Sequence, residues 1–337
     1  MLRLYLKALC ELAGDGGSVR FVSLNDGHVG SDELRLCSGK RLVEWRACSR
    51  SRVRFIGSAL RMGLVSDRIV CGHIAQLPVA WAAAAIRPRL PYFLVAHGIE
   101  VWRPFTFFER RALKGARCVW CVSEFTRRKL LENCGLPLER TAVLFNALDP
   151  SLDPTSPVPA ADGPPVILTI SRLSTADGYK GVEHLIEAMP AVRKEVPDAR
   201  LRIVGRGDGL AGLQGIARGL GLGGAVEFAG YKSDSELEQE FARCRLFALP
   251  SQKEGFGLVY LEAMAHGRPC LGARAGGTPE VITDDVGMLV EYGDVPAIAA
   301  AIVTSLRRNW REDKILERAQ AFSYLRFRER LASLLSA

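Results

Sequence analysis

The sequence predicts an α/β protein made of two doubly wound domains. A chain of 337 residues is too long for one ordinary core, and two domains of about 150 residues each are the expected solution. Short β-rich runs alternate with helical stretches, as in parallel sheets whose strands are joined by crossover helices. Between positions 150 and 165 lie six of the 17 prolines, and such a stretch suits a linker. We therefore expect an N-terminal domain over 1–150, a linker over 151–165 and a C-terminal domain over 166–312.

Most of the strand candidates are nearly all apolar, as expected for strands covered on both faces. In the first half they are Val19–Leu24, Arg68–Gly72, Tyr92–Ala96, Cys118–Ser123 and Ala142–Phe145. In the second half they are Val166–Ser171, Arg200–Val204, Val226–Ala229, Leu246–Leu249 and Cys270–Ala273, and a helix follows most of them. The tail from about Asp313 to Leu335 contains no Gly or Pro and is predicted to be helical, over 313–337 in all.

The composition is that of a globular protein, with 48% hydrophobic and 24% charged residues. The longest apolar run, around Val79–Ile86, is far shorter than the ~20 residues that a membrane span needs. Arg3 and Lys7 interrupt what would be the apolar part of a signal peptide. The nine scattered cysteines suit reduced thiols. We expect a cytoplasmic protein, with peripheral attachment to the inner face of the plasma membrane as a further option.

Cys118 and Cys121 form a CxxC inside an apolar strand candidate. An offset of three places them on opposite faces of a strand. Core packing is therefore the preferred interpretation over a redox or metal role.

The charge is unevenly divided along the chain. Residues 1–160 contain 23 Lys and Arg against 14 Asp and Glu, and the remainder contains 22 against 23. A basic half beside a neutral half points to an anionic partner, such as acidic lipid or a phosphorylated acceptor, or else to a solvated arginine-rich surface. No basic run is interleaved with aromatic residues in a nucleic-acid module, so we expect no nucleic-acid partner.

An anionic membrane surface is the partner that we predict for the N-terminal domain. Five arginines are grouped closely at positions 46, 50, 52, 54 and 61. Arg110, Lys114 and Arg117 have the spacing of one helix face, which makes that helix the first candidate for the contact. Phe105, Phe108 and Leu113 on the same helix or just before it are either part of the contact or ordinary core.

The most informative segment is EGFGLVYLEAMAHG, which begins at Glu254. Gly255 and Gly257 let backbone N–H groups approach a ligand at a helix N-terminus, where phosphate binds well. Glu262 is an acid on an otherwise apolar helix, and a buried carboxylate needs a hydrogen-bonding partner. A ribose diol supplies one, and a neighbouring helix cap is the structural alternative.

The spacing of Glu254 and Glu262 does not fit a glycosidase pair. Retaining hydrolases hold their two carboxyl groups roughly 5 Å apart and inverting ones roughly 6.5–9.5 Å apart. Eight residues of helix span about 12 Å. That span suits a ligand with a sugar at one end, a diphosphate in the middle and a ribose at the other.

Two cations follow the strand candidate Val166–Ser171, and one histidine follows Tyr92–Ala96. Arg172 comes directly after its strand, and Lys180 follows eight residues later between glycines. Cations at the carboxyl end of a parallel sheet are well placed to neutralise a diphosphate, although either one alone is as readily part of a solvated loop. His97 at a strand end can bond a substrate hydroxyl or be structural.

Together these elements resemble the retaining GT-B glycosyltransferases of group 1 (family 4), which include phosphatidylinositol mannosyltransferases and polysaccharide-assembly enzymes. The resemblance covers nearly the whole chain, from about Val19 to Leu335, and is strongest over Glu254–Glu280. Within that stretch RAGGTPE, at 274–280, belongs to the pattern. Weaker matches are CGH at 71–73, VSEFT at 122–126, NALD at 146–149, VGRG at 204–207 and FAGY at 228–231.

The resemblance implies roles for individual residues. Arg172 and Lys180 would hold the donor diphosphate, Glu254 would bind hydroxyls of the transferred sugar, Glu262 would bind the ribose, and His97 would touch the sugar from the first domain. The other positions implied to bind the donor, several of them through backbone, are Gly255, Phe256, Gly257, Leu258, Gly205, Tyr231, Gly276 and Gly277.

The fold that the resemblance implies is GT-B: two facing Rossmann-like domains with a cleft between them, and a C-terminal helix that returns to the N-terminal domain. The implied reaction moves a hexose from a UDP- or GDP-sugar to a lipid-linked or saccharide acceptor, with retention of anomeric configuration, in cell-envelope or exopolysaccharide assembly. No cofactor and no metal are implied, and the chain contains no Asp-x-Asp.

One departure from the family pattern concerns the start of the chain. Such enzymes usually begin with a strand and a Gly-Gly loop ahead of their first helix, whereas here MLRLYLKALCEL already reads as that helix. The first strand of the N-terminal domain is therefore expected to be missing. A catalytically impaired or partner-dependent homologue that binds nucleotide sugar is the alternative function, and a basic anion-binding module without catalysis is the alternative from another class.

Overall fold

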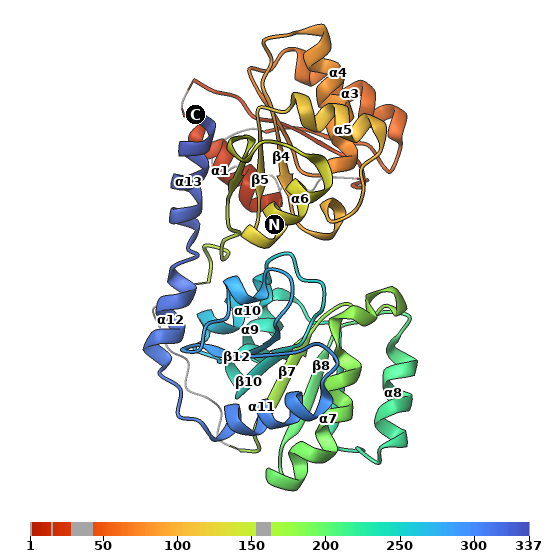
Figure 1. The fold of residues 1–337 in the computed structure, drawn as a ribbon, viewed down its shortest axis with the longest axis vertical. Helices are drawn as coiled ribbons and strands as arrows, with labels where there is room; N and C mark the ends of the chain where they lie inside the picture. The colour runs from red at the N-terminus through yellow and green to blue at the C-terminus, as the bar shows by residue number, and fades with distance from the viewer. Residues whose placement is uncertain (1, 15, 28–42, 153–162, 337) are drawn as a thin grey trace. The chain divides into compact units, whose positions relative to one another are not determined.

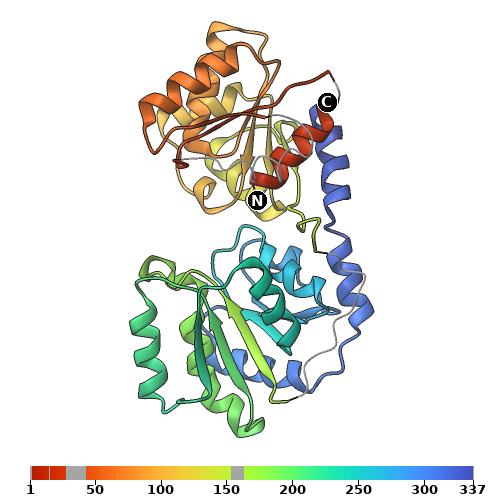
Figure 2. The same ribbon diagram turned by 180° about the vertical axis from the view of Figure 1, so that it is seen from behind.

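The computed structural model describes residues 2–14, 16–27, 43–152 and 163–336. The chain divides into two compact units (Figures 1 and 2). Unit 1 comprises residues 1–147 and 324–337, and unit 2 comprises residues 148–323. Both are built from parallel strands and crossover helices, as the alternation of apolar and helical segments predicts.

Unit 1 contains six described strands and several helices. In chain order they are α1 (Leu2–Leu12), β1 (Arg20–Ser23), β2 (Glu44–Ala47), α3 (Arg52–Leu64), β3 (Ile69–Cys71), α4 (Leu77–Ile86), β4 (Tyr92–Ala96), η2 (Ile99–Val101), α5 (Phe107–Gly115), β5 (Cys118–Cys121), α6 (Glu124–Cys134), β6 (Thr141–Val143) and α13 (Tyr324–Ser336). Among the described residues β3-β4-β5-β6 form one parallel sheet, and β1 and β2 form a separate parallel pair. The segment predicted to be the first helix is helix α1.

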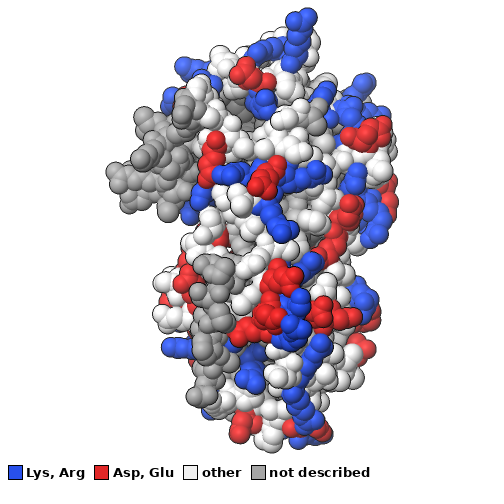
Figure 3. All heavy atoms as spheres, turned by 90° about the vertical axis from the view of Figure 1, so that its left-hand side faces the viewer, with Lys and Arg blue, Asp and Glu red and all other residues white. Residues whose placement is uncertain are grey.

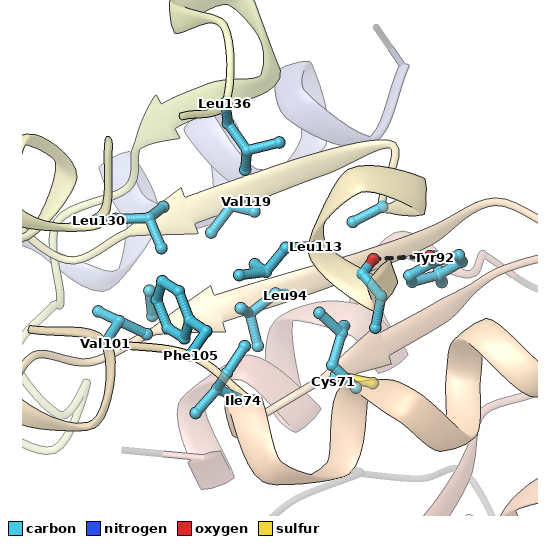
Figure 4. Close-up of a cluster of buried hydrophobic side chains, with 14 of the residues drawn as sticks. Cys71, Ile74, Tyr92, Leu94, Val101, Phe105, Leu113, Val119, Leu130 and Leu136 are labelled. Carbon is cyan, nitrogen blue, oxygen red and sulfur yellow. Dashed lines mark hydrogen bonds between the residues drawn. The ribbon is translucent and has the colours of Figure 1, made fainter. Parts of the chain in front are cut away.

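The two faces of the four-stranded sheet carry separate cores. On one face, α4, α5 and α6 cover side chains such as Leu94 and Val119 (Figure 4). In the same cluster the Tyr92 hydroxyl donates to the Ala112 carbonyl oxygen at 2.7 Å, which ties β4 to α5. On the other face, α1 and α13 cover Phe93 and Trp120. Alternate residues of β4 therefore serve opposite cores, which explains why this strand is apolar throughout.

Unit 2 is a six-stranded parallel sheet in the order β12-β11-β10-β7-β8-β9. Its elements are β7 (Val166–Ile170), η4 (Thr175–Lys180), α7 (Val182–Glu195), β8 (Arg200–Val204), α8 (Leu210–Gly219), β9 (Val226–Gly230), α9 (Asp234–Arg243), β10 (Leu246–Leu249), α10 (Leu258–Ala265), β11 (Cys270–Ala273), η5 (Thr278–Glu280), β12 (Gly287–Val290), α11 (Val295–Arg307) and α12 (Glu312–Gln320). From β7 the chain adds β8 and β9 on one side, and then β10, β11 and β12 on the other. The strand order thus reverses between β7 and β10.

Two strands and one break were not predicted. β2 and β12 are absent from the predicted strands, and the tail expected as one helix over 313–337 is two helices, α12 and α13. Helix α12 stops at Gln320, and the buried Phe322 packs its ring 5.4 Å from that of Phe256 in unit 2. Helix α13 instead belongs to unit 1. Most of the proposed linker, residues 153–162, lies outside the described residues.

Cys118 and Cys121 belong to the cores on opposite faces of β5, as predicted for a strand with this spacing. Both are free cysteines, and burial raises the pKa of each thiol, which keeps it protonated and unreactive. Within the part of the chain that the structure describes, no helix is both long enough and apolar enough to span a membrane.

Candidate functional site

The predicted donor-binding residues of unit 2 follow the carboxyl ends of five neighbouring strands. Arg172 and Lys180 follow β7, Gly205 follows β8, Tyr231 follows β9, Glu254 follows β10, and Gly276 and Gly277 follow β11. Because all these strands are parallel, their carboxyl ends lie at one edge of the sheet. Ligands of doubly wound sheets bind at this edge where the strand order reverses, which here is between β7 and β10.

A close ion pair joins the loops that follow β7 and β10. The Lys180 ammonium donates to Glu254 Oε2 at 2.8 Å, and the two side chains are only 20% and 17% exposed. The Gln252 amide donates to the Tyr179 carbonyl oxygen at 2.8 Å and fixes the same two loops through their backbones. Lys180 and Glu254, 74 residues apart in the sequence, therefore meet at the point where the strand order reverses.

Arg172 is held more loosely than Lys180. Its side chain is 79% exposed, and its guanidinium lies 3.2 Å from Asp177 Oδ1. Asp177 is buried and also accepts a hydrogen bond from the Tyr179 hydroxyl at 2.8 Å. Asp177 thereby fixes the loop between the two predicted cations. Sequence reasoning missed Asp177 because an Asp before a Gly reads as an ordinary turn.

Glycines allow the loops after β10 and β11 to lie against each other. Gly276 has a φ of +61°, and a Cβ there would collide with the Glu254 carbonyl oxygen. A Cβ at Gly277 would likewise collide with the Gly255 carbonyl oxygen, and the Gly277 amide donates to the Glu254 carbonyl oxygen at 2.7 Å. The position of Glu254 is therefore set by its backbone neighbours as well as by Lys180.

Helix α10 begins at the same edge of the sheet, directly after a turn that requires a glycine. Gly257, with a φ of +98°, precedes Leu258, the first helical residue, and a Cβ at Gly257 would collide with the ring of Tyr260. The Phe256 side chain is buried, with its ring 5.4 Å from that of Phe322, so it packs in the core of unit 2 and does not reach a ligand. An α-helix N-terminus that presents free N–H groups favours an anion.

Glu262 lies one turn into α10, where its carboxyl is mostly buried. Burial raises the pKa of Glu262, and the carboxyl of Asp234 acts in the same direction. The Glu262 carbonyl oxygen lies 2.8 Å from His266 Nδ1. A ligand hydroxyl that donates a hydrogen bond to this carboxylate would offset the cost of its desolvation and so stabilise its charged form.

The loops after β8 and β9 carry an exposed aromatic ring with a cation over it. The Tyr231 ring is 66% exposed, and the Arg206 guanidinium lies 4.8 Å from its centroid. Gly205 has a φ of +146°, and a Cβ there would collide with the Ser171 carbonyl oxygen. Sequence reasoning did not single out Arg206, which nevertheless lies over the face of Tyr231.

His97 belongs to unit 1, where it follows β4. Its Nε2 lies 3.1 Å from the Gly72 carbonyl oxygen, and its backbone N–H donates to Glu100 Oε1 at 2.5 Å. Since a carbonyl only accepts, Nε2 carries the proton and Nδ1 is left as an acceptor. Nδ1 is buried and has no hydrogen-bond partner in the described chain. Burial lowers the pKa of His97, partly opposed by Glu100, so the ring is neutral.

The structure thus brings the predicted residues of unit 2 to one edge of one sheet and places His97 at the corresponding edge of the sheet of unit 1. Within the described segments, no group of three or more His, Cys, Asp or Glu side chains is arranged to hold a metal ion.

Comparisons with known proteins identify the family of the chain. Residues 5–152 match the family model described as Glycosyltransferase Family 4, and residues 156–322 match the model described as Glycosyl transferases group 1. The two models together span both units.

Relatives whose functions are curated match part of the chain. A GDP-mannose-dependent α-(1-6)-phosphatidylinositol monomannoside mannosyltransferase of Mycolicibacterium smegmatis is 34% identical over 61% of this chain and 58% of its own length. An N-acetyl-α-D-glucosaminyl L-malate synthase of Bacillus anthracis is 38% identical over 47% of this chain and 41% of its own length. The matches therefore span about half the length of these relatives.

Solved structures match nearly the whole chain. Anabaena HepE in complex with UDP and glucose has a TM-score of 0.77 and 25% identity, with 98% of this chain and 96% of that chain covered. The lipopolysaccharide outer core galactosyltransferase WaaB has a TM-score of 0.75 over 99% of this chain and 96% of that chain, and at 17% identity it shows the fold alone. With its two parallel-sheet units and both family models matched, the chain belongs to the group 1 glycosyltransferases of GT-B fold.

Proposed function

We propose that the protein transfers a hexose from a UDP- or GDP-sugar to a lipid-linked or saccharide acceptor, with retention of anomeric configuration. The observation that carries this proposal is the Lys180–Glu254 pair at the reversal point of the unit 2 sheet, beside the N-terminus of α10. A cation and a helix N-terminus suit a diphosphate, and a neighbouring carboxylate suits sugar hydroxyls. Arg172, exposed on the same edge, supplies a second cation.

The proposed chemistry requires no metal or other cofactor. The bond between the anomeric carbon and the diphosphate oxygen breaks, and the acceptor oxygen forms a new bond to that carbon on the same face. The proton of the acceptor hydroxyl passes to the departing diphosphate. Lys180 and the N–H groups at the start of α10 stabilise the negative charge that develops on the leaving group, which is usually the largest contribution to such catalysis. His97 Nδ1 accepts a hydrogen bond from a sugar hydroxyl.

The relatives support both the donor and the acceptor class. HepE has been solved with UDP and glucose, and the mycobacterial relative is named for GDP-mannose, so UDP and GDP both remain candidates. The same relative is named for a phosphatidylinositol mannoside acceptor, which supports a lipid-linked acceptor here. We propose a role in cell-envelope or exopolysaccharide assembly for a cytoplasmic protein, with peripheral attachment to the inner face of the plasma membrane as a further option.

Release of UDP or GDP from a panel of nucleotide sugars tests the proposal. An active transferase releases nucleotide slowly with water alone and faster with a lipid or glycan acceptor, and NMR of the product gives its anomeric configuration. Donor binding without release would instead support the catalytically impaired homologue. If neither binding nor release occurred with any donor, an anion-binding module would be the better description.

The basic half of the chain supports an anionic membrane as partner. The segment from Arg50 to Arg117 holds twelve Lys and Arg against three Asp and Glu, which accounts for the whole excess of the first 160 residues. Figure 3 shows the side that lies to the left in Figure 1, and there basic and acidic side chains are interspersed. The excess of positive charge is therefore a property of the Arg50–Arg117 segment and not of every surface. Basic residues near an anionic leaflet contribute about 1 kcal/mol each.

A further inference from the structure

Helix α5 has a buried side and an exposed side of different chemistry. Glu109, Ala112, Leu113 and Ala116 have the spacing of one face and are buried in unit 1. The opposite face begins with two phenylalanines: Phe107 is 65% exposed and Phe108 is 60% exposed. Phe105 and Leu113, by contrast, belong to the core shown in Figure 4. The aromatic residues that the sequence grouped together thus divide between core and surface.

The exposed face of α5 combines aromatic rings with cations. Arg117, which was predicted to share a helix face with Arg110 and Lys114, lies beyond α5, which ends at Gly115. Phe107, Arg111 and Lys114 are four and three residues apart, which places them along one stripe of the helix. The Arg111 guanidinium lies 5.5 Å from the centroid of the Phe107 ring, and the Phe107 and Phe108 rings meet edge to face at 5.6 Å. We refer to Phe107, Phe108, Arg111 and Lys114 as the α5 stripe.

No acidic side chain of α5 faces the stripe. Glu109 is the one acid of the helix. It is buried, forms the capping box with the N-cap residue Thr106, and pairs with Arg103 at 2.7 Å. Large exposed aromatic pairs are costly in water, and aromatic rings beside Lys and Arg are the composition of segments that lie in a membrane interface. The charge and the rings therefore suit the same partner: phosphate headgroups for the cations and the acyl boundary for the rings.

We propose that the α5 stripe docks unit 1 on an anionic bilayer, with Phe107 and Phe108 inserted into the interface and Arg111 and Lys114 on lipid phosphates. This inference deepens the proposed function, on which it rests for the claim that the bilayer carries the acceptor. It differs from attachment by charge alone, because the inserted rings give a component of binding that salt does not screen.

A second copy of the chain is a poorer occupant of this surface. A symmetric contact between two α5 stripes would bring Arg111 and Lys114 of each copy toward the same cations of the other, and like charges across an interface disfavour it. Two phenylalanines and two cations also fall short of the roughly 800 Å² that each partner buries in a stable interface.

The stripe is adjacent in the chain to the predicted sugar-contacting residue. His97 directly follows β4, and residues 98–106, which include η2, lead from it into α5. Ile99 in this connection is itself 43% exposed. A bilayer bound at the start of α5 would therefore present a lipid-linked acceptor at the edge of unit 1 that carries His97.

Flotation with lipid vesicles tests the proposal on the full chain. Binding to vesicles of phosphatidylcholine alone is compared, from low to high salt, with binding to vesicles that also contain about 30% phosphatidylglycerol. This second composition imitates an anionic leaflet. The variants are Phe107→Ser/Phe108→Ser and Arg111→Gln/Lys114→Gln. Matched controls in unit 2 are Leu220→Ser, an exposed apolar residue, and Arg218→Gln/Arg245→Gln, two exposed cations.

The proposal predicts preferential binding to the anionic vesicles, with a part that persists at high salt. Loss of the two rings should lower the affinity for anionic vesicles at high salt about tenfold, which corresponds to about 1.4 kcal/mol. Loss of the two cations should weaken binding about tenfold at low salt and little at high salt, and the controls should bind as wild type.

Three results would overturn the proposal: equal or no binding to both kinds of vesicle, wild-type binding by the two-ring variant at every salt concentration, or a wild-type dimer that this variant abolishes. Nucleotide release without vesicles separates the two proposals. The ring variant should release nucleotide at the wild-type rate, and a protein that binds vesicles but releases no nucleotide would remove the proposed function while leaving the docking surface in place.

Discussion

The carboxyl edges of the two units are built in different ways. In unit 2 the edge is closed by short contacts: an ion pair of low exposure, and glycines at positions where a Cβ would collide with a neighbouring loop. In unit 1 the edge carries His97, whose Nδ1 has no hydrogen-bond partner among the described residues, and the loop beyond it leads to exposed rings and cations on α5. The difference fits the proposed division of roles, in which unit 2 binds the nucleotide sugar and unit 1 faces a larger acceptor surface.

The largest expected effect comes from Lys180, which is proposed to stabilise the leaving group and forms an ion pair with Glu254. Lys180→Ala should lower kcat/KM by roughly 2–4 kcal/mol of transition-state stabilisation, as loss of one oxyanion donor does. Lys253→Ala is the matched control, because Lys253 also lies beside the Tyr179 ring, at 5.6 Å, but has an exposed side chain. Wild-type turnover by Lys180→Ala would show that the closed edge of unit 2 is not the catalytic one.

In unit 1 the ion pair between Arg103 and the buried carboxylate of Glu109 is expected to support the fold and not the chemistry. Hydrogen bonds from Arg103 lower the pKa of Glu109 to about 2, with further help from Thr106. Because the folded pKa lies below the unfolded one, near 4.5, the stabilisation is present above pH 4.5 and is lost as the pH falls toward 2. Glu109→Gln should lower the free energy of unfolding at pH 7 by about 2–3 kcal/mol and by much less near pH 2.

Urea unfolding of the wild type, Glu109→Gln and the exposed control Glu139→Gln across this pH range measures the difference. A Glu109→Gln defect of the same size at every pH would mean that packing, and not charge, accounts for it.

A smaller effect is expected at His97, whose Nδ1 is proposed to accept one hydrogen bond from the sugar. Loss of a neutral hydrogen bond costs about 1 kcal/mol, so His97→Phe should lower kcat/KM about five- to tenfold. Burial holds the pKa of His97 below its usual value, so the neutral ring persists as the pH is lowered through 6.5. The His97 contribution should therefore stay constant from pH 8 to 6.5 and fall only below that; a decline centred at or above pH 6.5 would rule out the neutral acceptor.

Much of the fold followed from the sequence because continuous apolar runs identify strands that are buried on both faces. Tyr92–Ala96, Leu246–Leu249 and Cys270–Ala273 are such runs and have the predicted bounds. β2 reads EWRA, and its residues alternate between exposed and half-buried, so it gave no such run. β12 begins at Gly287, where a Cβ would collide with the Cys270 carbonyl oxygen; a glycine needed for close approach weakens the strand signal.

The candidate site was predictable as far as its residues follow strand ends. Parallel strands bring their carboxyl ends to one edge, so Arg172, Lys180 and Glu254 could be grouped from the sequence. Contacts that depend on the path of a loop could not be predicted, such as the one between Asp177 and Arg172. Which of the aromatic residues around α5 are exposed depends on how the helix is rotated, and the structure alone supplies that rotation.

The measurement that tests the comparison most directly is the affinity of the full chain for free UDP and GDP. Calorimetry compares the wild type with Glu262→Gln in unit 2 and His97→Phe in unit 1. A hydrogen bond from a ribose hydroxyl to a carboxylate contributes roughly 1.5–3 kcal/mol, so Glu262→Gln should raise the Kd for the preferred nucleotide about tenfold or more. His97→Phe should leave its Kd unchanged, because a free nucleotide brings no sugar to His97. Unchanged affinity in Glu262→Gln together with weakened affinity in His97→Phe would contradict a nucleotide site built by unit 2.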